Sequence, residues 1–272
     1  MTDQLELLSE TVQESIGNVV ARARLHDMYS GDGARLYHAT SENDKAELAN
    51  LLSTFLPEIK RRGVNMHVVD LCAGSGRITE ELSSLGIARI TAVDTSRELL
   101  KILDAKALPN VASVRSDAIE WLSQQPTNSL DFITIAAGSI RLFDHDQRLA
   151  LFSQLRRTLN EDGLLWFSHE YVSQPHAIFL PCEMNVDGAR LPAIFVSCPA
   201  RREGEEGAVN GYWVAQEQDS SADLYLSWVR QINKEELESE LVCAGFSTVE
   251  DDVRISPRRM AGGRTMMYFS AK

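Results

Sequence analysis

A turn of small residues is the first feature that could bind a ligand. Residues 70–76 read Asp-Leu-Cys-Ala-Gly-Ser-Gly and begin at the end of an apolar segment of strand length, Val64 to Leu71. Without bulky side chains, the backbone of such a turn can approach a ligand closely, and the helix that follows offers unpaired amides there. The segment therefore predicts a ligand-binding turn between a buried strand and a helix.

Two carboxylates follow at the ends of later strand-like segments. Asp94 ends the run ARITAVD, 18 residues beyond Gly76, and Asp117 stands in Ser-Asp-Ala after the run NVASVR. A carboxylate accepts two hydrogen bonds at once, so Asp94 suits a ligand that carries a diol. A second interpretation stays open for Asp94, which could instead cap the helix that follows it.

The turn fits a dinucleotide fingerprint poorly. In the pattern Gly-x-Gly-x-x-Gly, the third glycine allows close helix packing, and Thr79 occupies that place here. A nicotinamide-dependent oxidoreductase is therefore the less favoured hypothesis for this site.

The elements that position these residues alternate between apolar runs of strand length and segments of helical period. This rhythm is typical of a doubly wound, mostly parallel α/β sheet. Beyond Tyr171, three strand-like runs follow without a helix between them, which predicts an antiparallel insertion at about residues 178–232. We expect a seven-stranded Rossmann-like sheet within residues 61–272, interrupted after its fifth strand, and a helical arm or lid over residues 1–60.

Composition limits the class of protein. The 272 residues, 44% of them hydrophobic, are enough for a full core. A formal net charge of -12 disfavours nucleic acid as a partner. The four cysteines form no CxxC pair, and no run of about 18 apolar residues occurs. We therefore expect a cytoplasmic protein with neither a metal nor a membrane partner.

The turn, Asp94 and Asp117 in this order resemble the cofactor site of class I S-adenosylmethionine-dependent methyltransferases. The resemblance covers roughly residues 64–170 and 233–272, with Cys72 in place of the first glycine of the family's Gly-x-Gly-x-Gly. It implies S-adenosyl-L-methionine as cofactor, with Asp70 near its methionine end, Asp94 on the ribose hydroxyls and Asp117 near the adenine amino group. The cofactor-binding residues that it implies are Asp70, Cys72, Ala73, Gly74, Ser75, Gly76, Asp94, Thr95, Asp117, Ala118 and Ala136.

The acceptor is expected beyond the carboxyl ends of the strands, where ligands of open α/β sheets bind. The residues after the fourth and fifth predicted strands are the substrate-binding candidates: Ser139, Arg141, Glu170 and Tyr171. His169 is the candidate base, and a hydrogen-bonded structural histidine is the alternative interpretation.

The arm and the insertion together resemble small-molecule N-methyltransferases, such as amino-sugar N,N-dimethyltransferases and glycine N-methyltransferases. In those relatives a tyrosine-bearing arm folds over the cofactor and an insertion covers the acceptor, so Tyr37 is a candidate catalytic residue and Tyr29 an alternative. The resemblance implies an amine acceptor on a small natural product, amino sugar, amino acid or short peptide, and allows a homodimer.

Other functions stay open. A small-molecule O-methyltransferase and a noncatalytic cofactor-binding protein are the alternatives. An RNA methyltransferase is disfavoured, because the run AAGSIRLF after the fourth predicted strand lacks an Asn/Asp-Pro-Pro-Tyr-type loop.

Overall fold

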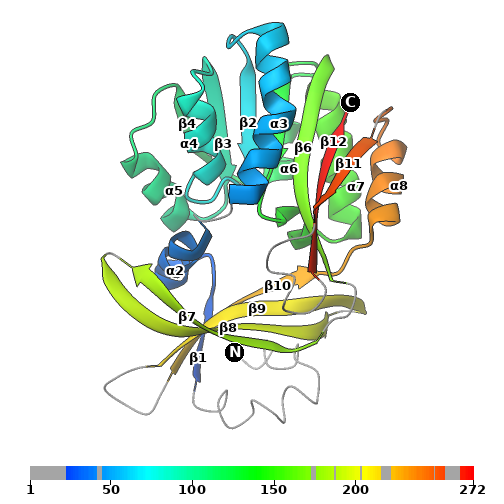
Figure 1. Ribbon diagram of the computed structural model, residues 1–272. Helices are drawn as coiled ribbons and strands as arrows, with labels where there is room; N and C mark the ends of the chain where they lie inside the picture. The colour runs from blue at the N-terminus through cyan, green and yellow to red at the C-terminus, as the bar shows by residue number, and fades with distance from the viewer. Residues whose placement is uncertain are drawn as a thin grey trace. The chain divides into compact units, whose positions relative to one another are not determined.

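A computed structural model describes residues 23–41, 45–172, 176–186, 188–202, 204–215, 222–247, 249–254 and 264–272. The chain divides into two compact units. Of the described residues, those within Met1–Thr40, Val172–Gln231 and Pro257–Arg264 form the insertion unit, and those within Ser41–Tyr171, Ile232–Ser256 and Thr265–Lys272 form the Rossmann-like unit. Each unit contains its own sheet (Figure 1).

The Rossmann-like unit has an α/β fold around a sheet with the strand order β11-β12-β6-β5-β2-β3-β4. The central pairs β5·β6, β2·β5, β2·β3 and β3·β4 are parallel, and β11·β12 is antiparallel. Its strands are β2 (His67–Leu71), β3 (Arg89–Asp94), β4 (Val111–Arg115), β5 (Leu130–Ile135), β6 (Leu159–Val172), β11 (Val249–Arg254) and β12 (Arg264–Ala271).

Helices cover both faces of this sheet (Figure 1). On one face α3 and α4 bury Leu51, Phe55 and Leu82 against strand residues such as Phe132 and Trp166. On the other face, α6, α7 and α8 form a second cluster with the strands. The helices of the unit are α3 (Lys45–Arg62), α4 (Arg77–Ser84), α5 (Arg97–Ala105), α6 (Ala118–Ser123), α7 (His145–Thr158) and α8 (Lys234–Cys243), with a short 3-10 turn η1 (Ser139–Leu142).

The described residues within 41–60, which the expected arm includes, lie in the Rossmann-like unit. Helix α3 belongs to the Rossmann-like unit, because its fully buried Leu51 and Phe55 belong to the hydrophobic cluster beneath the sheet. The arm is also not purely helical, since residues 23–27 form strand β1 (Ala23–Asp27). Residues 1–22 of the expected arm lie outside the described residues.

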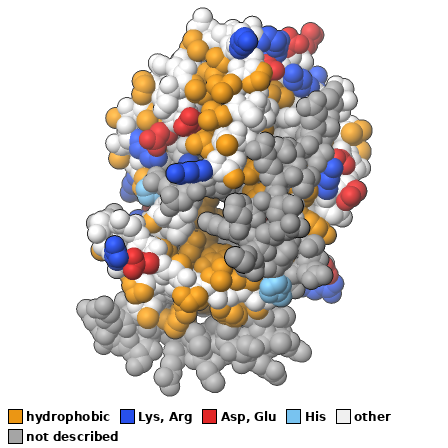
Figure 2. Space-filling view, viewed as in Figure 1, with side chains coloured by type: hydrophobic (Ala, Val, Ile, Leu, Met, Phe, Trp, Pro, Cys, Tyr) orange, Lys and Arg blue, Asp and Glu red, His pale blue; other side chains and the backbone are white. Residues whose placement is uncertain are grey.

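The insertion unit is a sheet with the order β1-β10-β9-β8-β7. Strands β7 (Ile178–Val186), β8 (Ala189–Arg202), β9 (Glu205–Ala215) and β10 (Ala222–Arg230) pair antiparallel in succession, and β1 pairs parallel with β10. Helix α2 (Gly31–Ser41) packs on this sheet, because Leu36 lies in a cluster with Met184 and Tyr225. Figure 2 shows hydrophobic side chains on the visible face of the insertion unit, and Phe179 and Leu180 on β7 are each 45% exposed.

Strand order places the ligand site of the Rossmann-like unit. The chain runs outward from β2 through β3 to β4, then returns to β5 on the other side of β2. Loops diverge at such a switch point, so the carboxyl ends of β2 and β5 border the natural ligand crevice of the fold. Within the described residues, no helix is long and apolar enough to cross a membrane.

Candidate functional site

The glycine turn, residues 70–76, contains three residues in the left-handed backbone region. Their φ angles are +55° at Cys72, +56° at Gly74 and +83° at Gly76. A Cβ atom on Gly76 would lie 2.3 Å from Leu103 Cδ1, so this position requires glycine both for its φ and for its packing on α5. Cys72, at the first glycine position of the pattern Gly-x-Gly-x-Gly, thus adopts a positive φ that glycine adopts more readily.

Asp94 holds the turn from the end of β3. Its Oδ2 accepts a hydrogen bond from the Gly74 amide at 2.8 Å, and its Oδ1 accepts one from the Ser96 amide at 2.8 Å. Burial raises the pKa of Asp94, against the lowering effect of these backbone amides. Each carboxylate oxygen has two lone pairs, so both keep the capacity to accept a further bond from a diol. The N-cap of the following helix is Ser96, whose side chain accepts from the Leu99 amide, so Asp94 does not cap that helix but organises the turn and presents a carboxylate beside it.

Asp70 is enclosed within the sheet. It is 1% exposed and accepts hydrogen bonds from Thr79 Oγ1 at 2.6 Å and from Thr134 Oγ1 at 2.9 Å. Burial raises the pKa of Asp70 to about 6, and the two hydroxyl donors oppose that rise. Thr79, which breaks the dinucleotide fingerprint, therefore has a role of its own as a donor to the acid that begins the turn.

The other predicted cofactor residues lie on the same edge of the sheet. Asp117 is exposed and caps α6, accepting from the Ile119 and Glu120 amides at 2.8 and 3.1 Å, and Ala118 is the buried first residue of that helix. Thr95 is exposed next to Asp94. Ala73, Ser75 and Ala136 are buried or half-buried around the turn and at the end of β5.

The loop after β5 is held by side chains that the sequence did not indicate. Ala137 and Gly138 both have left-handed φ angles, +57° and +65°. The Ala137 amide donates to Glu47 Oε1 at 2.7 Å, and the Gly138 amide donates to Ser168 Oγ at 3.0 Å. Glu47 lies 90 residues from Ala137 in the sequence, and a single acidic residue in a helix's first turn gives no signal of such a partner.

The predicted acceptor residues lie close together, although most are enclosed. Arg141 is 4% exposed and forms an ion pair with Glu170 at 2.8 Å, Ser139 is 8% exposed, and Tyr171 is half-buried against the core. The Arg141 guanidinium neutralises Glu170. This ion pair therefore stabilises the end of β6, and neither side chain presents an uncompensated charge to a substrate.

His169 has the surroundings of a structural histidine. It is fully buried, and its Nε2 lies 2.8 Å from the Ile232 carbonyl oxygen, to which it must donate. Burial lowers the pKa of His169 to about 4. Nδ1 then carries a lone pair but has no hydrogen-bond partner among the described residues. This environment favours the alternative interpretation of His169 over the catalytic base.

Tyr37 lies in the insertion unit on α2 and is half-buried. Its ring meets that of Tyr29 edge to face, with centroids 5.1 Å apart. The two tyrosines considered for the arm are therefore direct neighbours.

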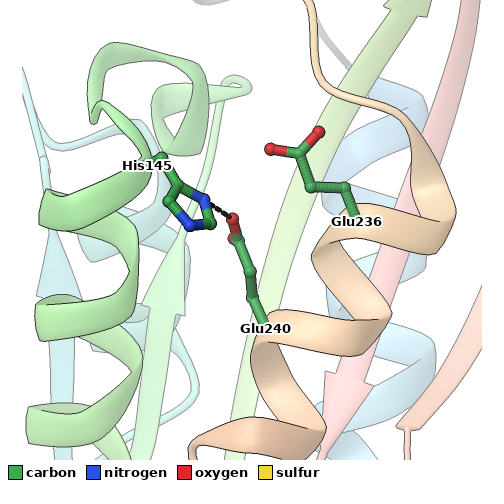
Figure 3. Close-up of side chains that lie close together, drawn as sticks. All are labelled: His145, Glu236 and Glu240. Carbon is green, nitrogen blue, oxygen red and sulfur yellow. Dashed lines mark hydrogen bonds and ion pairs between the residues drawn. The ribbon is translucent and has the colours of Figure 1, made fainter.

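Three side chains between α7 and α8 could together bind a metal ion. They are His145, Glu236 and Glu240, whose ligand atoms all lie within 4.8 Å of one another. Figure 3 shows His145 and Glu240 joined by a hydrogen bond, with Glu236 beside them on α8. The buried Arg148 already donates to both carboxylates, with Nη2 reaching Glu236 and lying 2.8 Å from Glu240 Oε1. The guanidinium supplies the positive charge, so we assign this cluster to helix packing.

The glycine turn fits a nucleoside cofactor. It combines three left-handed backbone positions, two of them glycines, with an anchored carboxylate at the neighbouring strand end. Small residues and a hydrogen-bond acceptor for a diol are what the ribose of S-adenosyl-L-methionine requires.

Comparisons with known families and solved structures bear on the class of this protein. The family described as methyltransferase domain matches residues 68–163. A search of curated proteins finds no match.

Three solved structures with a similar fold are methyltransferases that are named for sugar, amino pentose and glycopeptide substrates. The sugar N-methyltransferase KedS8 from Streptoalloteichus sp ATCC 53650 has 16% sequence identity and a TM-score of 0.62, covering 85% of this chain and 90% of its own. The amino pentose methyltransferase CalS10 from Micromonospora echinaspora has 14% identity and a TM-score of 0.63, covering 89% and 96%. The glycopeptide N-methyltransferase MtfA has 18% identity and a TM-score of 0.54, covering 95% and 97%.

At such identities these likenesses show the fold, and the family match identifies the domain within it. Residues 68–163 therefore match a methyltransferase domain, and the chain has the α/β fold of the solved methyltransferases described above.

Proposed function

We propose that this protein transfers a methyl group from S-adenosyl-L-methionine to an amine nitrogen of a small molecule or short peptide. The observation that carries the cofactor half is Asp94 anchored by the Gly74 and Ser96 amides beside a left-handed glycine turn. The nitrogen half rests on the structural likeness to enzymes named for sugar and glycopeptide N-methylation.

Methyl transfer from this cofactor requires little acid-base catalysis from the protein. The cofactor, when bound, supplies a methyl sulfonium, which is already a strong electrophile. The protein must hold the acceptor's lone pair in line with the breaking bond and exclude water. Asp94 would hold the ribose, Asp117 would lie near the adenine, and the loop from Ala136 to Ser139 would border the reacting methyl group.

Asp70 has an indirect part in this scheme. Because both of its oxygens are bound by threonine hydroxyls, it fixes the start of the turn, and contact with the methionine end would pass through the turn's backbone or water. An amine acceptor must be neutral before attack, and solvent can accept its proton.

We further propose that the insertion unit supplies the acceptor site, that α2 with Tyr37 acts as a lid, and that the chain forms a homodimer. The net charge of -12 suits a cationic amine. The lid and acceptor-site proposals rest on the resemblance of the arm and the insertion to small-molecule N-methyltransferases that the sequence shows.

Oxygen methylation is the second candidate, because a methyl sulfonium also alkylates an activated hydroxyl. A hydroxyl acceptor needs a committed base beside it, whereas a neutral amine does not.

The test begins with the cofactor. Titration calorimetry should show saturable, micromolar binding of S-adenosylhomocysteine, and Asp94→Ala should weaken it by about 1.5 to 3 kcal/mol, the scale of hydrogen bonds to a charged group. Asp94→Asn, which keeps an acceptor for one amide, separates the loss of charge from loosening of the turn. Binding of a nicotinamide cofactor with no response to S-adenosylhomocysteine would overturn the assignment.

The acceptor is tested separately. Methyl-labelled cofactor is incubated with panels of amines, alcohols and carboxylates, and the products are analysed by mass spectrometry. We expect label on amines, including amino sugars and peptide N-termini. Label confined to hydroxyl or carboxyl acceptors would refute the nitrogen proposal and leave the cofactor assignment intact.

A further inference from the structure

We propose that Glu47 is a positioning residue that fixes the loop after β5 and couples this loop to the glycine turn. The inference rests on the proposed function, since that loop is where the acceptor would meet the reacting methyl group.

The carboxylate of Glu47 joins two segments that are distant in sequence. Glu47 is 1% exposed in the first turn of α3. Its Oε1 accepts from the Ala137 amide at 2.7 Å, and its Oε2 accepts from Arg77 Nη2. Arg77 is the first residue of α4 and directly follows Gly76, the last residue of the glycine turn.

Both segments are conformationally demanding. Gly76 ends the glycine turn at φ +83°, and Ala137 and Gly138 form consecutive left-handed residues. The amides of Ala137 and Gly138 are bound by side chains, Glu47 and Ser168, so the left-handed conformation of the loop depends on these two acceptors. A non-glycine residue such as Ala137 keeps a positive φ only where its surroundings impose it.

The buried carboxylate of Glu47 depends on two partners, Arg77 and the Ala137 amide. A buried carboxylate is stable only when it is paired and hydrogen-bonded, and Arg77 and the Ala137 amide meet that need on separate oxygens. Displacement of Arg77 by a change in the turn therefore alters the charge balance on the group that holds Ala137. Cofactor occupancy of the turn is in this way transmitted to the acceptor side.

The same helix offers a matched control. Glu58 on α3 is 8% exposed and is also bound by cations, with Arg61 at 2.6 Å, Arg62 at 3.0 Å and Lys272 at 3.2 Å. None of these partners belongs to the glycine turn or to the loop after β5. Glu58→Gln thus removes a comparable charge from α3 without touching the proposed link.

The first measurement needs no activity. In protein labelled with ¹⁵N-alanine, hydrogen exchange of the Ala137 amide is compared between wild type, Glu47→Gln and Glu58→Gln. We expect Glu47→Gln to speed this exchange by about tenfold or more, as the bond to a charged acceptor is weakened, and Glu58→Gln to leave it unchanged. S-adenosylhomocysteine should slow the exchange in wild type and not in Glu47→Gln.

The second measurement separates positioning from stability. With the acceptor found by the mass-spectrometric screen, kcat of Glu47→Gln should fall by about tenfold or more, since misplacement of reacting groups acts on the chemical step. Its dissociation constant for S-adenosylhomocysteine should stay within about threefold of wild type, and Glu58→Gln should keep the wild-type kcat.

Unchanged Ala137 exchange in Glu47→Gln overturns the inference, as does an equal loss of kcat in both variants. If wild type neither binds S-adenosylhomocysteine nor methylates any acceptor, the proposed function fails and the coupling fails with it. The exchange rate in the free protein still decides whether Glu47 holds the loop.

Discussion

Cys72 shows how a single departure from a family pattern can be accommodated. Its φ of +55° lies in the region where a side chain normally costs stability, and its thiol is half-buried against the core. Burial raises the pKa of this thiol well above its ordinary value, so it stays neutral and packs as a small apolar group. The turn therefore keeps its shape without its first glycine.

Substitutions at two positions of the same turn should differ in their effects on stability and binding. Gly76→Ala should lower the free energy of unfolding and abolish S-adenosylhomocysteine binding, because its Cβ would lie 2.3 Å from Leu103 Cδ1 at a positive φ. Cys72→Gly relieves strain and should bind with wild-type affinity, its stability within about 1 kcal/mol of wild type. Urea unfolding and calorimetry measure both. Normal binding by Gly76→Ala would show that the turn tolerates rearrangement.

His169 should make the folded protein sensitive to acid. Its pKa falls from an ordinary value of 6.5 to about 4 in the folded state, so between these values the unfolded chain binds the proton more tightly. The stability contributed by neutral His169 is thus present above about pH 6.5 and lost as pH falls toward 4, by up to about 3 kcal/mol.

His169→Gln keeps a donor for the Ile232 carbonyl and removes the titration. The gap in unfolding free energy between wild type and His169→Gln should therefore shrink as pH falls from 7 to 4.5. Asp70 acts in the opposite direction, because its raised pKa favours the folded state below about pH 4 and that contribution is lost as pH rises through about 6. It is present in both proteins and cancels from the difference. A constant gap across this range would mean that His169 does not titrate as its burial implies.

Among the elements, helices α7 and α8 are held together by a buried guanidinium. Arg148 on α7 is 2% exposed and donates through Nε and Nη2 to Glu240 on α8, at 2.9 and 2.8 Å. Nη1 also donates to the Phe143 carbonyl at 3.1 Å, so all three nitrogens of the head group donate hydrogen bonds. Leu151, Leu155, Leu237 and Leu241 from the same two helices lie in the surrounding core cluster.

Arg148→Met should destabilise the protein by about 3 to 5 kcal/mol, because it leaves Glu240 buried without its charge partner. Glu236→Gln, whose side chain is 36% exposed, should cost under about 1 kcal/mol. Urea unfolding with and without EDTA distinguishes the roles of the cluster. A loss of stability on chelation would show that His145, Glu236 and Glu240 hold a metal.

Helices and strands with a regular pattern of apolar residues could be predicted from the sequence. Elements that form only through contacts with residues distant in sequence could not. The apolar runs of β2 to β6 and the leucines of α7 carry their own signal, and an α/β Rossmann-like fold follows from their alternation. The five residues of β1 carry none, because they become a strand by pairing with β10, whose partner residue Ala222 is 199 positions from Ala23. Helix α3 likewise joins the Rossmann-like unit through Leu51 and Phe55, which its own sequence cannot assign to either unit.

At the scale of the whole molecule, the insertion unit is assembled from both sides of the Rossmann-like unit in sequence. The chain leaves after β6, forms β7 to β10 and returns before α8, while β1 and α2 reach the same sheet from the N-terminal side. The sequence predicted the antiparallel insertion, because its strand-like runs have no helical segments between them. Its N-terminal contribution depends on contacts such as Leu36 with Tyr225, and the candidate site similarly depends on Glu47 and Ser168, whose partners are set by the fold.

The last prediction concerns α2 as a lid. Leu36 is 4% exposed and packs with Met184 and Tyr225, so α2 should respond to ligand together with the insertion sheet. We expect hydrogen exchange of α2 and of β10 to slow when S-adenosylhomocysteine and an acceptor bind together, while exchange of α8 stays unchanged. Leu36→Ala should uncouple the two responses, leaving β10 protected and α2 as exchangeable as in the free protein. Tyr37→Phe, which keeps the ring beside Tyr29, should preserve the coupled response. Equal exchange of α2 with and without ligands would make this helix ordinary packing of the insertion unit and would refute the lid.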